Sequence, residues 1–410
     1  MSDSDSQMPR ARIPLFPFRE TGNRLALDEN ITVTSALECG NGKNLNCVGP
    51  AHFTVELISD EVPISEAMPE CYVCVRVTNE SPQPREVKID IIVPRSLIDN
   101  NWTYMVNNPY YVRRGDVWET LPQESCIIGM NIYRVIVQLD ANETVLVSNA
   151  QPYPYSTMSA RLQDWATEYS DRAHLHSIGK TAQGRDIWML SLGLADDKPH
   201  ILMHGTPQPN EVGAVAAEGV IEFLLGDSTE AVQLLKRYTI HVIPQPNPDG
   251  VVLGKIHVNS KGQMVGYGYA EAVAGHPDAP EEAKAIWKWI VEHRPIVLID
   301  MHGLWPGYAD RPTLPYIFDK ELYHSDTLRA LIPHLDRALI ALDEEGAYRF
   351  IEKDRVFWSG MVTYQAIDKF DTIAYLYDMW GLGAKGTKHR IVQVMRTVID
   401  FYEKLRSSHT

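Results

Sequence analysis

Apolar and polar residues alternate in short runs through the first 150 residues, and this period of two is typical of β-strands. Turn signals such as Asn79-Glu-Ser-Pro82 separate the runs. Because several such runs follow one another without a helical pattern, residues 21–152 are predicted to form an all-β sandwich. Residues 1–20 are polar and are expected to form a flexible N-terminus. The clearest expected strands are 52–58, 71–77, 87–93, 132–139 and 144–148.

The pattern changes at residues 151–156, where Pro152 and Pro154 stiffen a link between two regions. Beyond the link, apolar residues recur at helical spacing, and these segments alternate with short apolar runs. This alternation predicts a layered α/β/α domain with a mixed sheet over residues 153–410. The expected helices are 156–169, 212–225, 281–292, 325–345 and 386–404, and the expected strands are 186–192, 200–203, 238–243, 296–300 and 372–377.

The composition of the chain argues against some classes of binding partner. The chain has 410 residues, is 44% hydrophobic and carries a net charge of −15 without a run of Lys or Arg, so a nucleic-acid partner is not expected. No apolar run approaches the roughly 18 residues of a membrane span, and the first residues lack the apolar core of a secretory signal. The five cysteines are an odd number and lie in the first third, which favours reduced thiols and a cytoplasmic protein.

The segment PHILMHGTPQPNEVGA, residues 199–214, is the most informative part of the chain. A strand-like run at 200–203 ends in a Gly205-Thr-Pro turn, which leads through Gln208-Pro-Asn-Glu211 into an apolar helical pattern. Ligands of open α/β sheets bind at the carboxyl ends of the strands. This order of elements therefore indicates a pair of metal ligands mounted at a strand end.

Three further segments follow at consistent spacing: residues 177–187, the turn Asn247-Pro-Asp-Gly250 and the run Val297-Leu-Ile-Asp-Met-His-Gly303. Together with residues 205–211, they resemble the M14 metallocarboxypeptidases in order and spacing. The segment Asn149-Ala-Gln-Pro-Tyr-Pro-Tyr-Ser156 resembles the link that follows the β-sandwich of the cytosolic carboxypeptidases. The resemblance covers residues 50–400, roughly, and implies a zinc-carboxypeptidase-like α/β domain after the sandwich.

The resemblance implies one zinc ion, which the family holds with His, Glu and His while water takes the open position. Gln208, Glu211 and His302 occupy these three positions here. Because an amide oxygen is a poorer zinc ligand than imidazole, binding is expected to be weaker than usual. His204 is a substitute for Gln208, although its place before the turn favours a core histidine. Asp300 either orients His302 or is an ordinary acid at a strand end.

Two tyrosines are the candidates for proton transfer. The family has a general-base glutamate in a pattern like Thr-x-Glu-Leu-x-Asp, and the run from Ile373 to Asp378 places Tyr375 at that glutamate. A tyrosine with a pKa near 10 is a poor base at neutral pH unless a cation lies beside it. Tyr364 resembles the mobile tyrosine that covers the substrate, or is a packed aromatic residue.

The residues that would bind substrate also depart from the family. Asn210 and Asn247 lie in the two matching turns, while His257 and Tyr267 stand near the positions where the family has carboxylate-binding arginines. A bidentate guanidinium is thus lost, and Lys255 or Lys261 would supply only a point charge. A free C-terminal carboxylate is therefore not the expected handle.

These observations predict a zinc-dependent hydrolase that cleaves an amide, peptide-like bond in a peptide or small molecule with altered specificity. The alternative is a catalytically inactive relative that serves as a binding or regulatory protein, since the first ligand, the base and the clamp are all replaced. A Ser or Cys nucleophile is a weaker alternative, because no Gly-x-Ser-x-Gly motif is present and the cysteines lie in the sandwich. The oligomeric state is left open.

Overall fold

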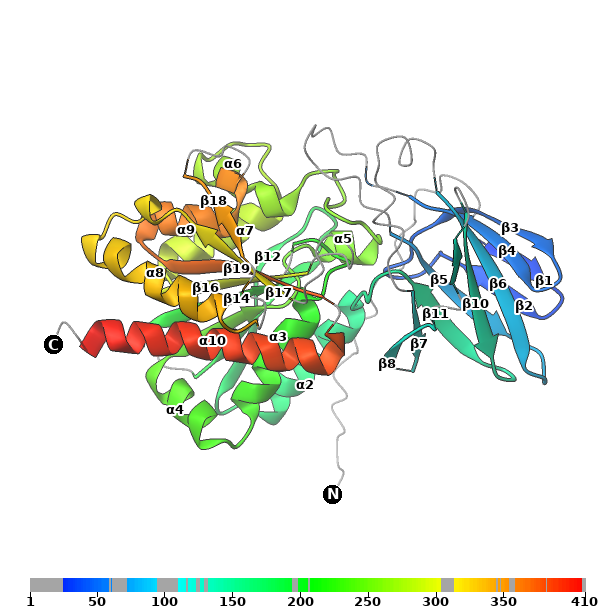
Figure 1. Cartoon of the computed structure of the whole chain (residues 1–410), viewed down its shortest axis with the longest axis horizontal. Coiled ribbons are helices and arrows are strands. Elements are labelled where there is room, and N and C mark those ends of the chain that lie inside the picture. The colour runs from blue at the N-terminus through cyan, green and yellow to red at the C-terminus, as the bar shows by residue number, and fades with distance from the viewer. Residues whose placement is uncertain are drawn as a thin grey trace, which may run out of the picture.

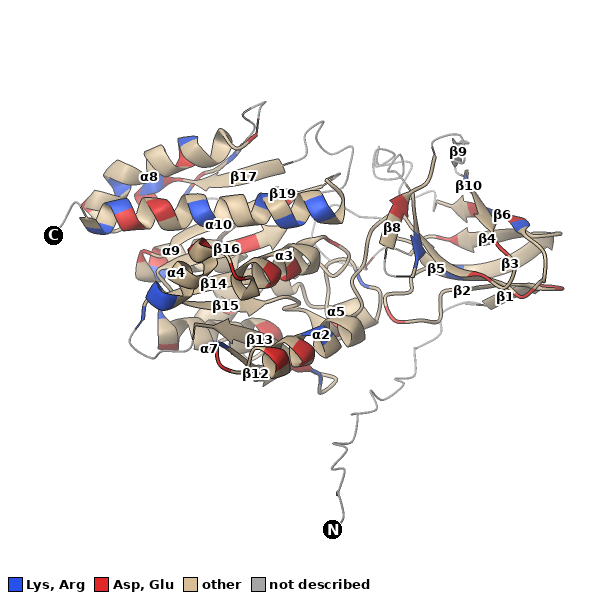
Figure 2. Cartoon of the chain, turned by 90° about the horizontal axis from the view of Figure 1, so that it is seen from below, with Lys and Arg blue, Asp and Glu red and all other residues tan. Residues whose placement is uncertain are grey.

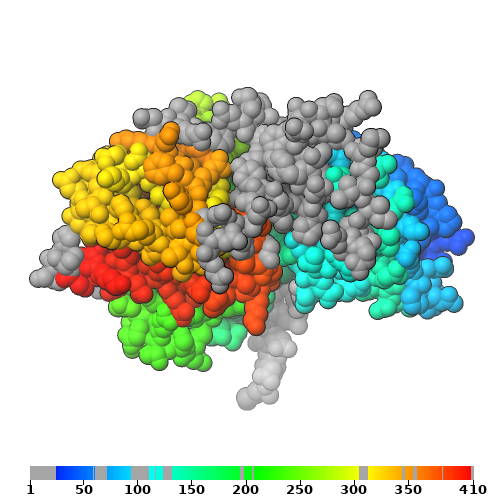
Figure 3. Space-filling view, viewed as in Figure 1, coloured from blue at the N-terminus to red at the C-terminus, as the bar shows by residue number. Residues whose placement is uncertain are grey.

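The computed structural model describes residues 25–58, 60, 72–93, 110–115, 117–122, 126–128, 132–193, 198–205, 207–303, 313–343, 346, 348–353, 358–380 and 382–407. These residues form two regions that lie side by side, a β region and an α/β region (Figures 1 and 3). The predicted class, a mixed-sheet α/β fold preceded by strands, is confirmed. The expected flexible segment 1–20 lies outside the described residues.

The N-terminal region contains two sheets. The strands of the first, in the order β1-β2-β5-β11-β7-β8, are β1 (Leu25–Asp28), β2 (Ile31–Thr34), β5 (Cys74–Asn79), β11 (Thr144–Ser148), β7 (Tyr111–Arg114) and β8 (Val117–Thr120). The strands of the second, in the order β3-β4-β6-β10-β9, are β3 (Lys43–Gly49), β4 (His52–Glu56), β6 (Arg85–Ile92), β10 (Ile132–Leu139) and β9 (Cys126–Ile128). The inward residues of alternating strands, such as Val33, Phe53 and Val135, share one hydrophobic core.

The predicted bounds of β10 and β11 are those of the structure. The strand expected at 71–77 instead begins at Cys74 and continues to Asn79. Tyr72 pairs with Ile58 through an isolated bridge, so this part of the apolar run connects two strands and is not part of a ladder. A continuous apolar run therefore marked the strand but not its first residue.

The α/β region is built on one sheet in the order β12-β13-β15-β14-β16-β19-β17-β18. Its strands are β12 (Ala173–Lys180), β13 (Asp186–Leu192), β14 (His200–Gly205), β15 (Thr239–Ile243), β16 (Val297–His302), β17 (Thr313–Phe318), β18 (Arg349–Ile351) and β19 (Ile373–Met379). The central pairs β15–β14, β14–β16 and β16–β19 are parallel, whereas β12–β13, β13–β15 and β17–β19 are antiparallel. The predicted mixed sheet is thus present.

Helices cover both faces of this sheet (Figures 1 and 2). They are α2 (Tyr155–Glu168), α3 (Gly213–Leu225), α4 (Thr229–Arg237), α5 (Pro248–Val252), α6 (Tyr269–Val273), α7 (Glu281–His293), α8 (Asp326–Ile340), α9 (Val362–Phe370) and α10 (Gly383–Ser407). Short 3₁₀ turns are η3 (Val265–Tyr267), η4 (Lys320–Leu322) and η5 (Trp358–Gly360). Among the described helices none is long and apolar enough to cross a membrane. On α10, Lys and Arg recur along the helix, whereas the acidic residues Asp400 and Glu403 lie toward its C-terminal end (Figure 2).

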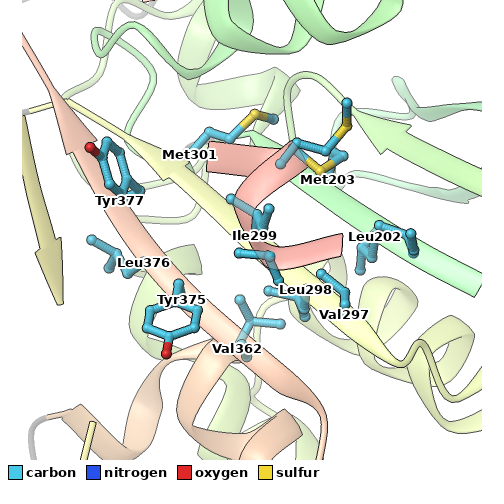
Figure 4. Packing of buried hydrophobic residues seen from close by; sticks show 14 of the residues in the cluster. Leu202, Met203, Val297, Leu298, Ile299, Met301, Val362, Tyr375, Leu376 and Tyr377 are labelled. Atoms are coloured by element: carbon cyan, nitrogen blue, oxygen red, sulfur yellow. The ribbon is translucent and has the colours of Figure 1, made fainter. Parts of the chain in front are cut away.

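Because helices cover both faces, the central strands are buried along their whole length. Every residue of β16 and β19 is buried, and this explains why both strands appear in the sequence as apolar runs without alternation. Met203, Ile299 and Met301 pack with Tyr375 and Tyr377 in this core (Figure 4). The few polar side chains on these strands therefore need partners or a function.

The β region holds one loop of the α/β region by direct hydrogen bonds. Asp60 Oδ2 accepts from the backbone amides of Ile256, His257 and Val258, at 2.9, 2.8 and 3.1 Å. The Asn41 side chain donates to the carbonyl of Gly254 at 2.8 Å. The Asp60 side chain is only 2% exposed, so it is the acceptor that satisfies these amides within the structure.

Replacing Asp60 with Ala should therefore release this loop. Three buried amides lose their acceptor, and we expect a destabilisation of about 1–3 kcal/mol. Hydrogen exchange should become faster at residues 256–258 while the central strands keep their protection. Asp28→Ala is the control, because Asp28 accepts from Ala51 at 2.7 Å inside the β region. Equal exchange at 256–258 in wild type and Asp60→Ala would contradict this role.

Candidate functional site

Polar side chains gather where the three central parallel strands end. In the register of the sheet, His204 of β14 pairs with Asp300 of β16, and His302 of β16 pairs with Asp378 of β19. Paired residues of parallel neighbours direct their side chains to the same face of a sheet. All four are buried, with between 0 and 3% of each residue exposed. The sequence therefore carries a charged cluster into an otherwise apolar sheet.

Asp300 lies between two imidazole rings. Its Oδ1 is 2.7 Å from His204 Nδ1, and its Oδ2 is 3.0 Å from His302 Nε2. Burial alone would raise the pKa of Asp300, but the neighbouring His302 and His204 outweigh it and lower the pKa to about 2. Burial opposes a charge on His302, but Asp300 and Glu211 outweigh it and raise the pKa of His302 well above its usual value. This contact favours the first of the two roles predicted for Asp300, which is to orient the His302 ring.

His204 is not placed as a ligand. Its second nitrogen, Nε2, lies 3.1 Å from the Tyr269 hydroxyl on α6, so both ring nitrogens have partners within the core. The residue is completely buried. The structure thus gives His204 the role of a hydrogen-bonded core histidine, and Gln208 as the first ligand stays a prediction.

The turn after β14 brings Glu211 to His302. Glu211 Oε2 lies 3.4 Å from His302 Nδ1 and accepts from the backbone amide of Gly303 at 2.8 Å. Gln208 and Asn210 are in the same turn and are 8% and 4% exposed. Both polar atoms of the Asn210 amide are buried and have no hydrogen-bond partner among the described residues. A buried amide in this condition calls for an explanation, and a bound ligand provides one.

Asn247 ties three loops together around this turn. It caps α5 by accepting from Gly250 at 3.0 Å, and its amide donates to the carbonyls of Pro207 at 3.1 Å and Val258 at 3.2 Å. Asn247, predicted to bind substrate, is therefore fully used in positioning the Gln208 turn and the His257 loop. His257 itself is 8% exposed beside this bridge.

Asp378 is the carboxylate that faces His302. Burial raises the pKa of Asp378 to about 7, with a contribution from Glu211, while His302 and a hydrogen bond from Tyr316 act in the opposite direction. Its Oδ2 is buried without a hydrogen-bond partner among the described residues. A carboxyl group that titrates near neutral pH beside two ligand-type side chains has the properties of a general base.

Tyr375, predicted as the base, lies on the other face of β19. It pairs with Ile299, three positions before Asp378, so the alternation of the strand turns its side chain away from His302. Its hydroxyl donates to Asp336 of α8 at 2.5 Å. Burial raises the pKa of Tyr375 well above its ordinary value. The structure does not bring Tyr375 to the candidate site, and Asp378 occupies the place expected for it.

The remaining predicted residues fall into two groups. Tyr267 is on η3, and its ring centroid is 6.5 Å from that of Trp358. It also contributes to the raised pKa of Tyr316, the partner of Asp378. Tyr364 is on α9, and its hydroxyl donates to the Lys353 carbonyl at 2.5 Å. No contact among the described residues joins Tyr364 to His302 or Glu211, so its capping role stays a prediction.

Asp378, Tyr316 and Arg349 were not predicted as site residues. Arg349 packs over the rings of Tyr316 and Trp358, 5.6 and 5.0 Å from their centroids, and its charge helps to lower the pKa of Asp378. The sequence contains a signal for Asp378, because an acid follows a wholly apolar run at a strand end. For Tyr316 and Arg349 it contains none, since they reach the site through the pairing of β17 and β18.

The donors can be compared with what zinc requires. His302 Nδ1 and Glu211 point toward one another, and Asp300 occupies the other side of the imidazole, which leaves Nδ1 for a metal. Among the described residues no three His, Cys, Asp or Glu side chains are grouped to hold a metal ion, so Asp378 does not complete a triad. Glu211 and His302 have the chemistry of two zinc ligands, and Gln208, in the same turn as Glu211, is the predicted third. An amide oxygen would be the weakest donor of such a set.

Comparisons with known proteins agree with this geometry. Residues 158–265 match the family model described as zinc carboxypeptidase. The chain is 28% identical to mouse carboxypeptidase M over 202 residues, which is 44% of each protein. It is 24% identical to cytosolic carboxypeptidase 2 of Danio rerio over 172 residues, 39% of this chain and 24% of the relative. The chain thus spans less than half the length of these curated relatives.

Solved structures establish the fold over most of the chain. A metallo-carboxypeptidase from Burkholderia cenocepacia superposes with a TM-score of 0.74 at 14% identity, over 92% of this chain and 99% of that one. A Pseudomonas aeruginosa metallo-carboxypeptidase in complex with (2-guanidinoethylmercapto)succinic acid gives 0.72 at 16% identity, over 91% and 99%. The predicted resemblance to the M14 metallocarboxypeptidases is confirmed.

The position of Asp378 predicts a pH dependence of stability in the metal-free protein. An aspartate titrates near pH 3.9 when unfolded, roughly, whereas the pKa of folded Asp378 is about 7. Protonated Asp378 thus stabilises the fold fully below pH 4, approximately, and this contribution falls as the pH rises toward 7. The free energy of unfolding of wild type minus that of Asp378→Asn should fall by up to about 1.4 kcal/mol per pH unit. Denaturation with chelator present measures it, and a difference independent of pH would contradict the assignment.

Proposed function

Since the chain has the metallocarboxypeptidase fold and matches the zinc carboxypeptidase family over residues 158–265, we propose that it is a zinc-dependent hydrolase. It cleaves an amide, peptide-like bond, with a specificity that differs from that of the family. The observation that carries the proposal is the contact of Glu211 with His302 at 3.4 Å, next to Asp378, which pairs with His302 in the register of the neighbouring strand. A sheet that was only a scaffold would gain nothing from burying these three groups together.

Gln208, Glu211 and His302 would hold one zinc ion. When bound there, zinc would polarise the scissile carbonyl and lower the pKa of water. Asp300 keeps the His302 ring in one orientation, and the Gly303 amide fixes Glu211. Because Asp300 and Glu211 raise the pKa of His302, a metal ion there would compete with a proton, and affinity should rise with pH.

Asp378 takes the proton from the attacking water and later returns it to the leaving nitrogen. Its buried Oδ2 is the atom available for this transfer, while the Tyr316 hydroxyl bonds to the carboxyl group. A carboxylate with a pKa near neutrality both accepts and donates a proton at pH 7. Tyr375 takes no part, because its hydroxyl is committed to Asp336 on the opposite face.

The altered specificity follows from the residues at the substrate positions. His257 and Tyr267 stand near the positions of the family's arginines, so a bidentate grip on a terminal carboxylate is absent from those two positions. The unpaired amide of Asn210 offers both a donor and an acceptor instead. This favours a neutral polar group next to the scissile bond, as in a blocked peptide or a small amide.

An inactive binding protein is the second candidate, and the observation that favours it is Gln208. Replacement of the first histidine ligand weakens the metal site without disturbing the fold. In either case we propose a peptide or small-molecule ligand and a cytoplasmic protein, supported by the cysteine pattern and by the resemblance to cytosolic carboxypeptidase 2. Neither a nucleic acid nor a membrane is proposed as a partner.

Metal content distinguishes the two candidates. We expect about one zinc per chain in wild type after dialysis against micromolar zinc, and loss of the metal in His302→Ala. Gln208→His should bind zinc roughly 10–100-fold more tightly, because imidazole replaces an amide oxygen. Elemental analysis and competition with a chelating dye measure both. Metal-free wild type together with metal-loaded Gln208→His would favour the inactive candidate.

Turnover tests the assignment of the base. Zinc-loaded protein is assayed against acylated dipeptides that carry either a free or an amidated C-terminus. Asp378→Asn should lower kcat by about 10²–10⁴-fold, since it removes the proton acceptor. Tyr375→Phe should retain kcat within a factor of about three, since it removes only a contact to Asp336. The account fails if Tyr375→Phe is inactive while Asp378→Asn turns over normally.

A further inference from the structure

A cavity lies at the opposite ends of the strands that carry the candidate site. Its volume is about 470 Å³, and its lining includes Ile296 and Thr372, the residues that directly precede β16 and β19. The C-terminal end of α10 forms another wall, on the side of the α/β region away from the β region (Figure 1). A volume of this size suits a small molecule, because ligand pockets are usually about 300–1,000 Å³.

The walls of the cavity combine apolar surface with two guanidinium groups. Leu328, Phe370 and Leu405 supply the apolar surface, and Arg294 and Arg406 supply the charge. The Arg294 guanidinium lies 4.9 Å from the centroid of the Phe370 ring, which holds it above that surface. An apolar chamber with a few convergent polar groups is the usual form of a small-molecule site.

The cavity is lined by two arginines, both exposed to solvent, and by the carboxylate of Asp371. In the part of the chain that the structure describes, neither Arg294 nor Arg406 forms an ion pair with a carboxylate. Asp371 also lines the cavity, but its two oxygens accept from the backbone amides of His324 at 2.6 Å and Ser325 at 3.1 Å. The arginines therefore favour an anionic ligand.

The backbone at two points of the lining is unusual. Arg294 ends α7 with φ of 46°, and Asp371 ends α9 with φ of 55°. Within the described residues from 155 to 407, these are the two non-glycine residues with positive φ. Glycine is the usual residue at such helix ends, because a side chain there is strained. Retained strain is characteristic of binding sites, and both of these residues line the cavity.

We propose that this cavity binds a small molecule with a carboxylate on an aromatic or alkyl body. The carboxylate pairs with Arg294 and Arg406, and the body packs on Phe370 and Leu405. This ligand is separate from the substrate of the strand-end site, so the proposal does not depend on the proposed function. Since the ligand contacts the residues that precede β16 and β19, it stabilises the same two strands that end in His302 and Asp378.

The test uses two probes, 4-phenylbutyrate and octanoate, with 4-phenylbutanol and octanol as uncharged controls. Isothermal titration calorimetry on the full chain should show binding of both carboxylates and at least tenfold weaker binding of the alcohols. Arg294→Gly and Arg406→Gln should each weaken carboxylate binding about tenfold. Arg294→Gly suits the left-handed backbone, so its melting temperature should equal or exceed that of wild type.

Arg396→Gln is the matched control, because Arg396 also lies over a phenylalanine ring, 4.7 Å from the centroid of Phe223, but outside the cavity. This variant should bind both carboxylates as wild type does. Three results would overturn the proposal: no carboxylate binding up to about 5 mM, equal affinity for acids and alcohols, or equal losses in Arg294→Gly and Arg396→Gln. Each result leaves the strand-end site unaffected.

Discussion

The buried carboxylate of Asp300 is the interaction on which the candidate site depends. It lies 2.7 Å from His204 and 3.0 Å from His302, in a residue that is 1% exposed. A buried charge is tolerated only with close partners, and loss of one partner is strongly destabilising. Asp300 thus commits His204 to the core and fixes His302 with its other nitrogen toward Glu211. One carboxylate determines which histidine is able to bind a ligand.

The site also depends on groups that are distant in the sequence. Asn247 joins the turn after β14 to the loop that carries His257, and Asp60 holds the same loop from the β region. The β region therefore supports the loop that carries His257, although it supplies none of the proposed metal ligands. A substitution in the β region that changes the candidate site is therefore expected to act by displacing loop 256–258.

Much of the fold could be predicted from the sequence, because its signals are local. The alternation before residue 150, the prolines near residue 152 and the mainly apolar runs of β16 and β19 each reflect one element and its environment. Glu211 and His302 could be predicted too, since each follows directly from a strand and its turn. The left-handed backbone of Arg294 could not be predicted, because the local sequence contains no glycine or asparagine to mark that helix end.

The candidate for the general base differs between the sequence prediction, Tyr375, and the structure, which places Asp378 opposite His302. The run Tyr-Leu-Tyr-Asp at 375–378 resembles the family's Glu-Leu-x-Asp. The shared leucine and aspartate place Tyr375 at the position of the glutamate. What decides the role is the face of the strand, and residues 375 and 378 point to opposite faces. That distinction depends on the pairing of β19 with β16, a contact between segments about 75 residues apart by chain position. Likewise, Tyr316 and Arg349 reach Asp378 only through sheet pairing.

Anomalous diffraction from a zinc-soaked crystal at neutral pH tests the central claim most directly. The account predicts one peak at about 2.0–2.2 Å from His302 Nδ1 and the Glu211 carboxylate, with Asp378 beside it and the Tyr375 hydroxyl still on Asp336. A peak elsewhere in the protein, together with none between Glu211 and His302, would contradict it.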